Sequence, residues 1–264
     1  MLKKIILILF AIFFLIPYFW MGYLSFKPES LVVELIPTFG DLTLENYEYM
    51  FGVRHFARWL FNALYISVMG VILTITSASM GGYVLAKKKF PGGQFIFYAM
   101  LASMAIPGNT VLIPKFLMMK NLGLINTYPS MYIMCISGVF GIFLMKQAMK
   151  TIPNEIMESG QIDGANELQI FWYLILPMVK PVTIAIGLFT FVGVYGGYYW
   201  QMLMTRSEVM RTLPLAIEFF KGERQPKIQL TMAAAMLASL PLIIVFAMFY
   251  KYFIEGPTMG SIKG

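Results

Sequence analysis

Residues 155–177, with the sequence EIMESGQIDGANELQIFWYLILP, are an acidic segment in a chain that is otherwise strongly apolar. The segment holds four of the thirteen carboxylates in the 264-residue chain. Pro153, two residues earlier, suits the first turn of a helix, where a missing N–H leaves no bond unmade. Glu155 and Glu158 then lie near the positive end of that helix's dipole. The stretch therefore predicts a short helix that ends near Ile162.

A second short helix is predicted after a turn at Asp163-Gly164. Asn166 can cap its first turn, and Gln169 stands three residues later, as in a capping box. Three apolar residues with i, i+3, i+4 spacing predict an apolar face on this helix: Leu168, Phe171 and Trp172. A helix resting on lipid would show the same face. Glu158 and Asp163 favour a protein partner instead, because an anionic membrane surface does not attract carboxylates.

The composition of the whole chain indicates an all-α polytopic membrane protein. Hydrophobic residues make up 59% of the sequence and charged residues 12%, about half the charge of a globular domain. Small residues such as Gly81-Gly82 and Gly193 predict close helix packing. Six apolar stretches are long enough to cross about 30 Å of hydrocarbon as transmembrane helices: 5–26, 60–86, 94–118, 128–147, 181–204 and 231–253.

The charged and reactive residues exclude several classes of function. No ionisable side chain lies in the middle of a predicted span, which argues against a proton-coupled carrier. The chain has no phosphate-binding G-x-x-x-x-G-K-[ST] loop. With Cys135 and His55 as its only cysteine and histidine, it offers no metal site and no catalytic constellation. Its net charge of +7 fits Lys and Arg flanking membrane spans better than nucleic-acid binding.

The distribution of Lys and Arg gives a predicted orientation. Each side of a six-span topology carries ten of the twenty basic residues, so the totals decide nothing. The N-terminal pair Lys3-Lys4 and the tight turn at 87–89 lie on short segments. Basic residues on short segments have the largest influence on the orientation of a membrane protein. They predict cytoplasmic N- and C-termini and place residues 155–177 on the cytoplasmic side. The loops 27–59 and 205–230 would face outward.

Residues 158–177 resemble the EAA motif of ABC importer permeases: E-A-A, three residues, G, nine residues, then I/L-x-L-P. Ser159 and Gly160 stand at the two alanines. The motif positions that match are Glu158, Gly164, Leu174, Leu176 and Pro177.

Other stretches, in the same order, resemble carbohydrate-uptake permeases of the maltose-transporter (MalG) type. They are IPGNTVLIPKFLMMKNLGLINTYPS (106–130), FLMKQAMKTIP (143–153), RTLPLAIEFF (211–220), LPLIIVFAMFYKYFIEG (240–256) and GSIKG (260–264). The resemblance implies a single transmembrane domain over residues 1–264. Its parts would be an N-terminal span (5–26), core spans (60–253), a coupling segment (153–177) and a cytoplasmic tail (254–264) that reaches the ATPase.

The resemblance also implies how the coupling segment works. In this family its second helix docks into a cleft of an ATPase subunit, so Leu168, Phe171 and Trp172 would be the buried anchors. Glu158 would make charge-assisted hydrogen bonds to the partner, and Gly164 would allow the sharp turn. Asp163, Ala165 and Pro177 complete the residues that the resemblance assigns to coupling.

The implied assembly lies in a bacterial or archaeal cytoplasmic membrane. It comprises this chain, a second related permease, two ATPase subunits and an extracytoplasmic solute-binding protein. The chain itself would bind no cofactor, because ATP and Mg²⁺ would be held by the ATPase subunits. Three alternatives stay open: an uncoupled channel or facilitator, an importer of a non-sugar solute such as glycerol phosphate, and an importer of uronate oligosaccharides.

One polar and aromatic run offers candidate substrate contacts near the outer end of the fifth predicted span. Aromatic faces and amides bind sugars, but an aromatic belt at the membrane surface has the same composition. The candidates are Tyr195, Tyr198, Tyr199, Trp200 and Gln201. Asn109 is a further candidate, and as an isolated amide in the third predicted span it also suits contact between helices. Whether this chain or its partner permease contacts the solute is left open.

Overall fold

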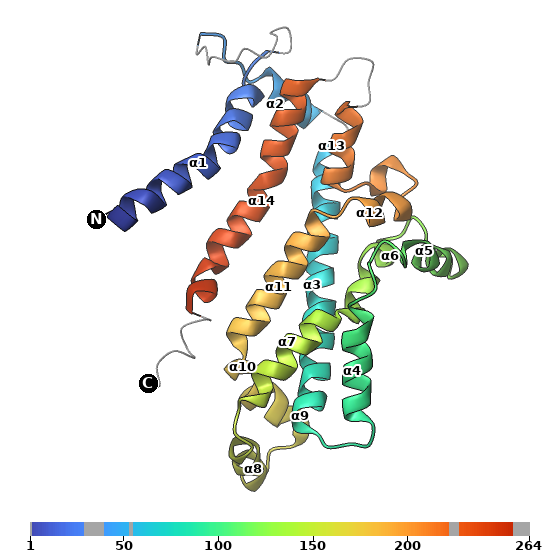
Figure 1. Ribbon diagram of the computed structural model, residues 1–264. Helices are drawn as coiled ribbons and strands as arrows, with labels where there is room; N and C mark the ends of the chain where they lie inside the picture. The colour runs from blue at the N-terminus through green and yellow to red at the C-terminus, as the bar shows by residue number, and fades with distance from the viewer. Residues whose placement is uncertain (1, 29–39, 53–54, 222–226, 256–264) are drawn as a thin grey trace. The chain divides into compact units, whose positions relative to one another are not determined.

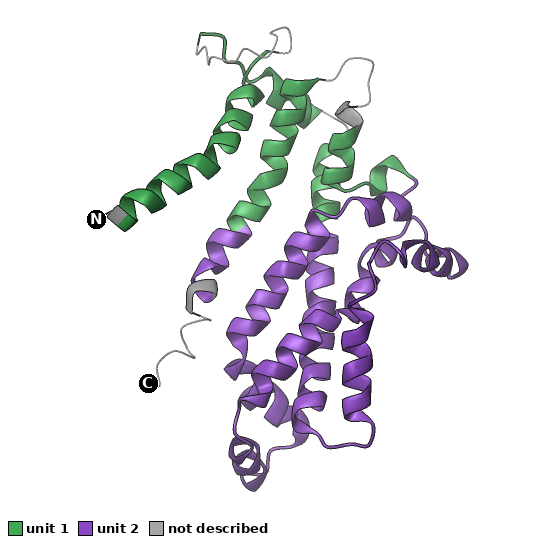
Figure 2. Cartoon of the chain, viewed as in Figure 1, with its two compact units in different colours: residues 1–63, 207–244 green, residues 64–206, 245–264 purple. Residues whose placement is uncertain are grey.

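The computed structural model describes residues 2–28, 40–52, 55–221 and 227–255, which contain helices and no strand (Figure 1). The chain divides into two compact units (Figure 2). Unit 1 comprises residues 1–63 and 207–244, and unit 2 comprises residues 64–206 and 245–264. Two long helices, α3 (Phe56–Lys87) and α14 (Ile228–Glu255), contribute to both units.

The other helices belong to one unit each. Unit 1 contains α1 (Leu2–Ser25), α2 (Glu45–Gly52), the 3₁₀ helix η3 (Glu208–Met210) and α13 (Leu213–Lys221). In unit 2 the first half consists of α4 (Gly93–Ser103), α5 (Leu112–Asn121), α6 (Tyr128–Tyr132), the 3₁₀ helix η1 (Ile133–Ser137) and α7 (Val139–Lys150). The second half consists of α8 (Glu155–Ile162), α9 (Glu167–Gln169), the π-helix η2 (Ile170–Ile175), α10 (Leu176–Met178), α11 (Lys180–Tyr195) and α12 (Tyr199–Met204).

Three of the predicted spans have helices long and apolar enough to cross a membrane, and the number rises to five if each of two bent helix pairs is counted as one span. Among the described residues, α1, α3 and α14 meet this condition alone. Two bent pairs meet it together: α6 and η1 with α7, bent by 41°, and the α9–α10 stretch with α11, bent by 80°. The larger bend turns the coupling segment away from the axis of α11. The predicted all-α membrane fold is therefore confirmed.

The third and fifth predicted spans are shorter than the sequence suggested. Helix α4 has 11 residues, or about 16 Å at 1.5 Å per residue. No helix covers residues 104–111, because Pro107 removes a backbone donor and disfavours helix before it. Helix α11 ends at Tyr195, before Gly196 and Gly197, and not near residue 204. Of the predicted tail 254–264, only residues 254 and 255 lie within the described part, at the end of α14.

Small residues bring α3 and α7 into close contact in unit 2. A Cβ atom on Gly82 would lie 2.4 Å from Cβ of Met145, so only glycine permits this approach. A Cβ atom on Gly141 would lie 3.0 Å from Cβ of Ala78. The prediction of close packing is confirmed at Gly82. It does not hold at Gly193, where a Cβ would meet nothing within 4 Å.

The apolar core of unit 2 lies around the coupling segment. Its buried members come from α3, α7, α8, η2 and α11 and from the connections after α7 and α10: Ala78, Tyr83, Met145, Met149, Ile152, Met157, Ile170, Phe171, Ile175, Val179 and Ile186. The polar segment 155–177 is thus not a loose loop. It is fixed on one face to the helices that precede and follow it.

Unit 1 contains a helix that is apolar on every side. Residues 3–19 of α1 are all exposed, as expected for a helix that contacts lipid or another chain. Beyond α1 the chain is tied to α2, because Asn46 Nδ2 donates to the carbonyl oxygens of Ser25 (2.9 Å) and Lys27 (2.7 Å). Helix α1 covers residues 5–25 of the predicted first span, 5–26, and is long and apolar enough to cross a membrane.

Candidate coupling site

The turn between the two short helices of the coupling segment is a Schellman motif. The amide of Ala165 donates to the carbonyl of Gly160 at 2.9 Å, and the amide of Gly164 donates to that of Gln161 at 3.0 Å. Gly164 has φ of +82°, in the left-handed region that side chains disfavour. The predicted end of the first helix at Ile162 and the turn at Asp163-Gly164 are both confirmed.

The second helix begins with the predicted capping box. The amide of Gln169 donates to Oδ1 of Asn166 at 3.0 Å, and the amide of Asn166 donates to Oε1 of Gln169 at 2.8 Å. These reciprocal bonds satisfy two backbone donors that a helix start leaves unpaired. The first turn of α9 is therefore defined by residues within the segment itself.

The predicted apolar face does not form as one patch. Residues 170–175 are a π-helix, with i→i+5 bonds, and its wider turn rotates the residue at i+3 away from the face that i and i+4 share. Leu168 is 66% exposed and Trp172 51% exposed, whereas Phe171 is 4% exposed. The Phe171 ring packs on Tyr83 with ring centres 5.2 Å apart. Phe171 is thus an internal anchor of this chain, and its expected role in a partner's cleft is corrected.

The surface that the segment leaves exposed combines apolar and acidic side chains. Four large apolar residues are exposed on it: Ile162, Leu168, Trp172 and Tyr173. The carboxylates of Glu155, Glu158 and Asp163 are also exposed, and the side chains of Glu158 and Asp163 make no hydrogen bond or ion pair with the part of the chain that the structure describes. A hollow of about 330 Å³ lies between the two short helices, lined by Gly160, Asp163, Gly164, Ala165, Gln169, Tyr173 and Leu174.

The end of α3 holds the coupling segment through contacts that the sequence reasoning missed. Tyr83 donates from its hydroxyl to Glu167 Oε2 at 2.9 Å, and Lys88 Nζ lies 2.5 Å from Glu167 Oε1. Lys87 Nζ donates to the carbonyl of Ile152 and to Oδ1 of Asn154. The opposite charges of Glu167 and the lysines at 87–89 are the one sequence signal that could have suggested these contacts.

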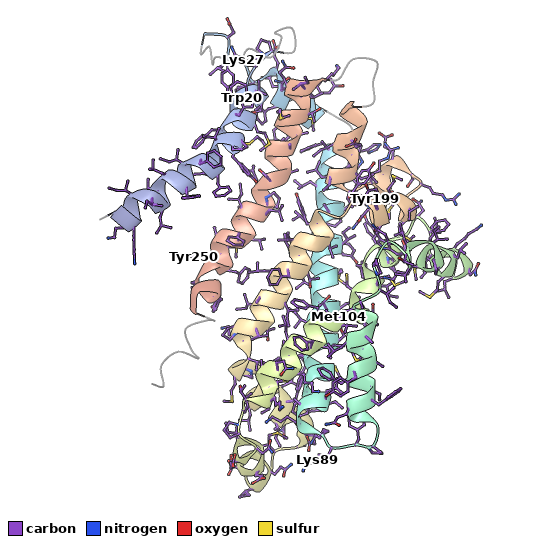
Figure 3. The ribbon with its side chains drawn as sticks, in the orientation of Figure 1. Trp20, Lys27, Lys89, Met104, Tyr199 and Tyr250 are labelled. Atoms are coloured by element: carbon purple, nitrogen blue, oxygen red, sulfur yellow. The ribbon has the colours of Figure 1, made fainter. Side chains whose placement is uncertain are left out.

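The predicted substrate residues lie at the other end of unit 2 from the coupling segment. Figure 3 shows Tyr199 and Lys89 at these opposite ends. Tyr195 is buried at the end of α11 and stacks on Phe191, with ring centres 5.7 Å apart. Tyr199 is exposed. The aromatic run is therefore not a single surface, because the helix ends at Gly196 and Gly197.

Three of the predicted residues, Tyr198, Trp200 and Gln201, do line one cavity of about 250 Å³. Trp200 Nε1 donates to the carbonyl of Ser130 at 2.9 Å, which fixes the indole. Gln201 Nε2 donates to the carbonyl of Val194, while its buried Oε1 has no hydrogen-bond partner among the described residues. Asn109 lies in the exposed turn between α4 and α5 and so is not an amide between packed helices. That expectation is corrected, because the third span ends before it.

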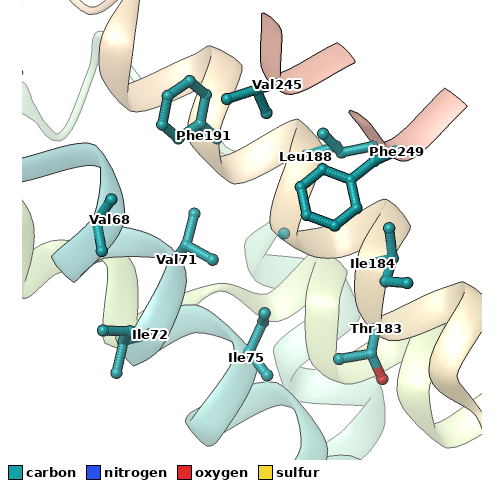
Figure 4. Close-up of a pocket in the computed structure, with 11 residues that line it drawn as sticks. Val68, Val71, Ile72, Ile75, Thr183, Ile184, Leu188, Phe191, Val245 and Phe249 are labelled. Carbon is teal, nitrogen blue, oxygen red and sulfur yellow. The ribbon is translucent and has the colours of Figure 1, made fainter. Parts of the chain in front are cut away.

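A second hollow in unit 2 is apolar (Figure 4). It has a volume of about 320 Å³ between α3, α11 and the last part of α14, and Thr183 provides its single polar side chain. Val71, Ile75 and Phe249 are typical of its lining. Because a hydrophilic solute needs several hydrogen-bonding groups, this hollow is not a sugar site. No group of His, Cys, Asp and Glu in the described ranges could hold a metal ion.

The sequence of residues 78–256 matches the family of binding-protein-dependent transport system inner membrane components. One relative is the arabinooligosaccharide transport system permease protein AraQ of Halalkalibacterium halodurans, 30% identical over 91% of this chain and 88% of its own length. Another is the trehalose/maltose transport system permease protein MalG of Thermococcus litoralis, 27% identical over 100% of this chain and 98% of its own.

Among solved structures, one chain of a bacterial ABC transporter involved in import of the acidic polysaccharide alginate has the same fold. The TM-score is 0.82 at 24% sequence identity, covering 96% of this chain and 95% of that one. The order of the helices, the EAA-like segment and these similarities all indicate the same family. The chain belongs to the family of binding-protein-dependent transport system inner membrane components.

Proposed function

We propose that this chain is the membrane-spanning permease of an ATP-driven importer for a sugar or oligosaccharide. The observation that carries the proposal is the exposed surface of residues 155–177. Aromatic and aliphatic side chains on short helices, next to unpaired carboxylates, suit a protein interface. The opposite face of the segment packs in the core of unit 2, so a partner that binds the exposed face and moves the segment also moves the helices that share this core.

The proposed docking partner is an ATPase subunit. Leu168 and Trp172 enter its cleft, while Glu158 and Asp163 make charge-assisted hydrogen bonds to its donors. Phe171 and Ala165 support these residues from within the chain. Closure of the ATPase pair around ATP and Mg²⁺ then pulls the segment and alternates access to the solute path. This chain supplies no catalytic group for hydrolysis and no ligand for the nucleotide.

The remaining assembly follows from the family and the relatives. A second related permease completes the solute path, and an extracytoplasmic binding protein delivers the solute, as the family's description indicates. The exposed apolar sides of α1 are available to lipid or to that second permease. Oligosaccharides are the proposed solutes because the relatives import arabinooligosaccharides and trehalose or maltose. Tyr198, Trp200 and Gln201 are the proposed contacts in this subunit, at their cavity.

The orientation in the cytoplasmic membrane is proposed from the lysines at the coupling end of unit 2. Besides the turn at 87–89, this end carries Lys150 before α8 and Lys180 after α10. Basic residues on short segments next to spans favour the cytoplasm. The coupling segment and both chain termini are therefore assigned to the cytoplasmic side.

The docking surface can be tested with the double variant Leu168→Ala, Trp172→Ala in the full importer. We expect normal membrane insertion but loss of the ATPase subunit on co-purification and loss of ATP-dependent uptake. Ile113→Ala on α5 is the matched control, since Ile113 is equally apolar and 69% exposed, at the other end of unit 2. Normal uptake by the double variant would exclude the proposed interface.

The rival functions have different outcomes in reconstitution. An uncoupled channel predicts solute flux through this chain alone in liposomes, whereas the proposal predicts none. Competition for uptake between neutral oligosaccharides, uronate oligosaccharides and glycerol phosphate identifies the solute class. Inhibition by glycerol phosphate alone would contradict the assignment of a sugar.

A further inference from the structure

The C-terminal end of α3 contacts both short helices of the coupling segment. On one side Lys87 Nζ donates hydrogen bonds to the carbonyl of Ile152 and to Oδ1 of Asn154, just before α8. On the other side Tyr83 and Lys88 bond Glu167, the first residue of α9. The Schellman turn lies between these two attachment points. One helix end thus holds the segment at its entry and again where its second helix begins.

The attachment at Glu167 combines a buried contact with an exposed one. Tyr83 is buried, and its ring packs on Phe171 while its hydroxyl donates to Glu167. The Lys88–Glu167 ion pair is open to solvent, with side-chain exposures of 36% and 53%. Lys88 Nζ also lies 5.7 Å from the centre of the Tyr83 ring. The three polar groups therefore form one connected cluster at the rim of the apolar core.

These polar contacts are not needed to fold the segment. Ile170, Phe171 and Ile175 already fix η2 in the core of unit 2, and the capping box and Schellman motif define the two short helices locally. A solvent-exposed ion pair adds little to stability. It is also easily broken and re-formed, which suits a contact that changes during a transport cycle.

We propose that Tyr83, Lys88 and Glu167 form a latch through which movement of the coupling segment is passed to α3. The proposal rests on the proposed function, since it needs a segment moved by an ATPase. In the latched state described here, α9 and the end of α3 move together. When the Lys88–Glu167 pair opens, Tyr83 and Phe171 stay in contact and the segment turns about them without carrying α3.

The test measures solute transported per ATP hydrolysed by the complete importer with its binding protein. Lys88→Gln and Glu167→Gln each remove the ion pair with little change of shape. We expect both to retain ATPase binding and hydrolysis while the transport ratio falls by about two- to fivefold. Tyr83→Phe keeps the ring on Phe171 and should lower the ratio less. Lys89→Gln is the matched control, because Lys89 is the exposed neighbour without an ion pair in the described part of the chain.

A charge exchange separates a latch from a general effect of substitution. The double variant Lys88→Glu, Glu167→Lys restores the opposite charges, so the ratio should return toward the wild-type value. The latch is wrong if the single variants keep the wild-type ratio, or if the exchange restores nothing. Failure of the proposed function looks different, because then the wild-type importer itself shows no ATP-dependent uptake. The melting temperature of each complex should stay close to the wild-type value, because an exposed ion pair adds little to stability, whereas a purely structural role predicts a clear loss.

Discussion

Two loops are fixed by α3, one in each unit, and their attachments differ in kind. In unit 1, Trp59 Nε1 donates to the carbonyl of Glu208, and Asn62 Nδ2 donates to the carbonyls of Val209 and Arg211, all at 2.8 Å. These donors are neutral and buried, and their acceptors are backbone atoms. In unit 2 the coupling segment is held by the buried Tyr83 hydroxyl and also by the Lys88–Glu167 pair, which is charged and open to solvent.

The difference predicts that the loop at residues 207–212 is fixed, whereas the attachment of the coupling segment can open. Bonds from buried neutral donors to backbone carbonyls are barely affected by salt, and breaking them leaves buried polar groups unsatisfied. An exposed ion pair is screened by salt and costs little to open. The loop at residues 207–212 should therefore keep its conformation through a transport cycle, while the attachment of the coupling segment can exchange. Four substitutions test this contrast.

The largest effect is expected for Asn62→Ala, which removes the donor to two carbonyls. We expect a loss of about 2–3 kcal/mol in the free energy of unfolding, because the carbonyls lose their partner in a partly buried site. Thermal unfolding of the purified importer measures it. Met80→Ala, an exposed truncation on the same helix, is the control. Equal melting temperatures for the two variants would remove the contrast between the loops.

Gly164→Ala should have the next largest effect. Gly164 has φ of +82° and open space around it, so the substitution adds backbone strain of about 1–2 kcal/mol without a clash. Gly92 has the same φ and the same open space in the turn before α4. Gly92→Ala should therefore cost similar stability but leave ATP-dependent uptake intact, whereas Gly164→Ala should impair it. Uptake and melting temperature, measured on the same variants, separate a loss of coupling from a loss of stability. Equal uptake by the two variants would exclude a role of Gly164 in coupling.

Trp59→Phe removes one hydrogen bond and keeps most of the aromatic packing. The expected cost is about 1 kcal/mol, since the carbonyl of Glu208 loses its indole donor. The effect should not change with ionic strength, because no charge is involved. A melting temperature difference that shrinks in high salt would show that the unit 1 loop is held by charges after all.

Glu167→Gln should have the smallest effect on stability, and its size should depend on pH. The hydrogen bonds from Lys88 and Tyr83 hold the pKa of Glu167 below its usual value of 4.5. A lowered pKa means that the contribution is complete above pH 4.5 and is lost as the pH falls through the native value. The loss in the free energy of unfolding relative to wild type should be under about 1 kcal/mol at pH 7 and vanish in acid. A difference that grows on acidification would contradict the ion pair.

Local features of the coupling segment were correctly predicted because they involve residues close in the chain. The capping box at Asn166 and the turn at Gly164 depend on neighbours within five residues. The orientation of Phe171 could not be predicted, because a π-helix and packing on Tyr83 set it. Asn109 was misplaced for a related reason: hydropathy suggested a continuous span, and the chain turns at Pro107 instead.

The sequence by itself determined that this is an apolar, helical chain of the membrane with a polar helix-turn-helix between two spans. Composition, hydrophobic length and capping residues are properties of short stretches, so they can be read without knowing the fold. Only the tertiary structure decided which side chains of that segment are exposed and which contact α3. Tyr83 and Glu167 are 84 residues apart in sequence. Their contact exists because Gly82 lets α7 approach α3 and thereby brings the segment that follows α7 to the end of α3.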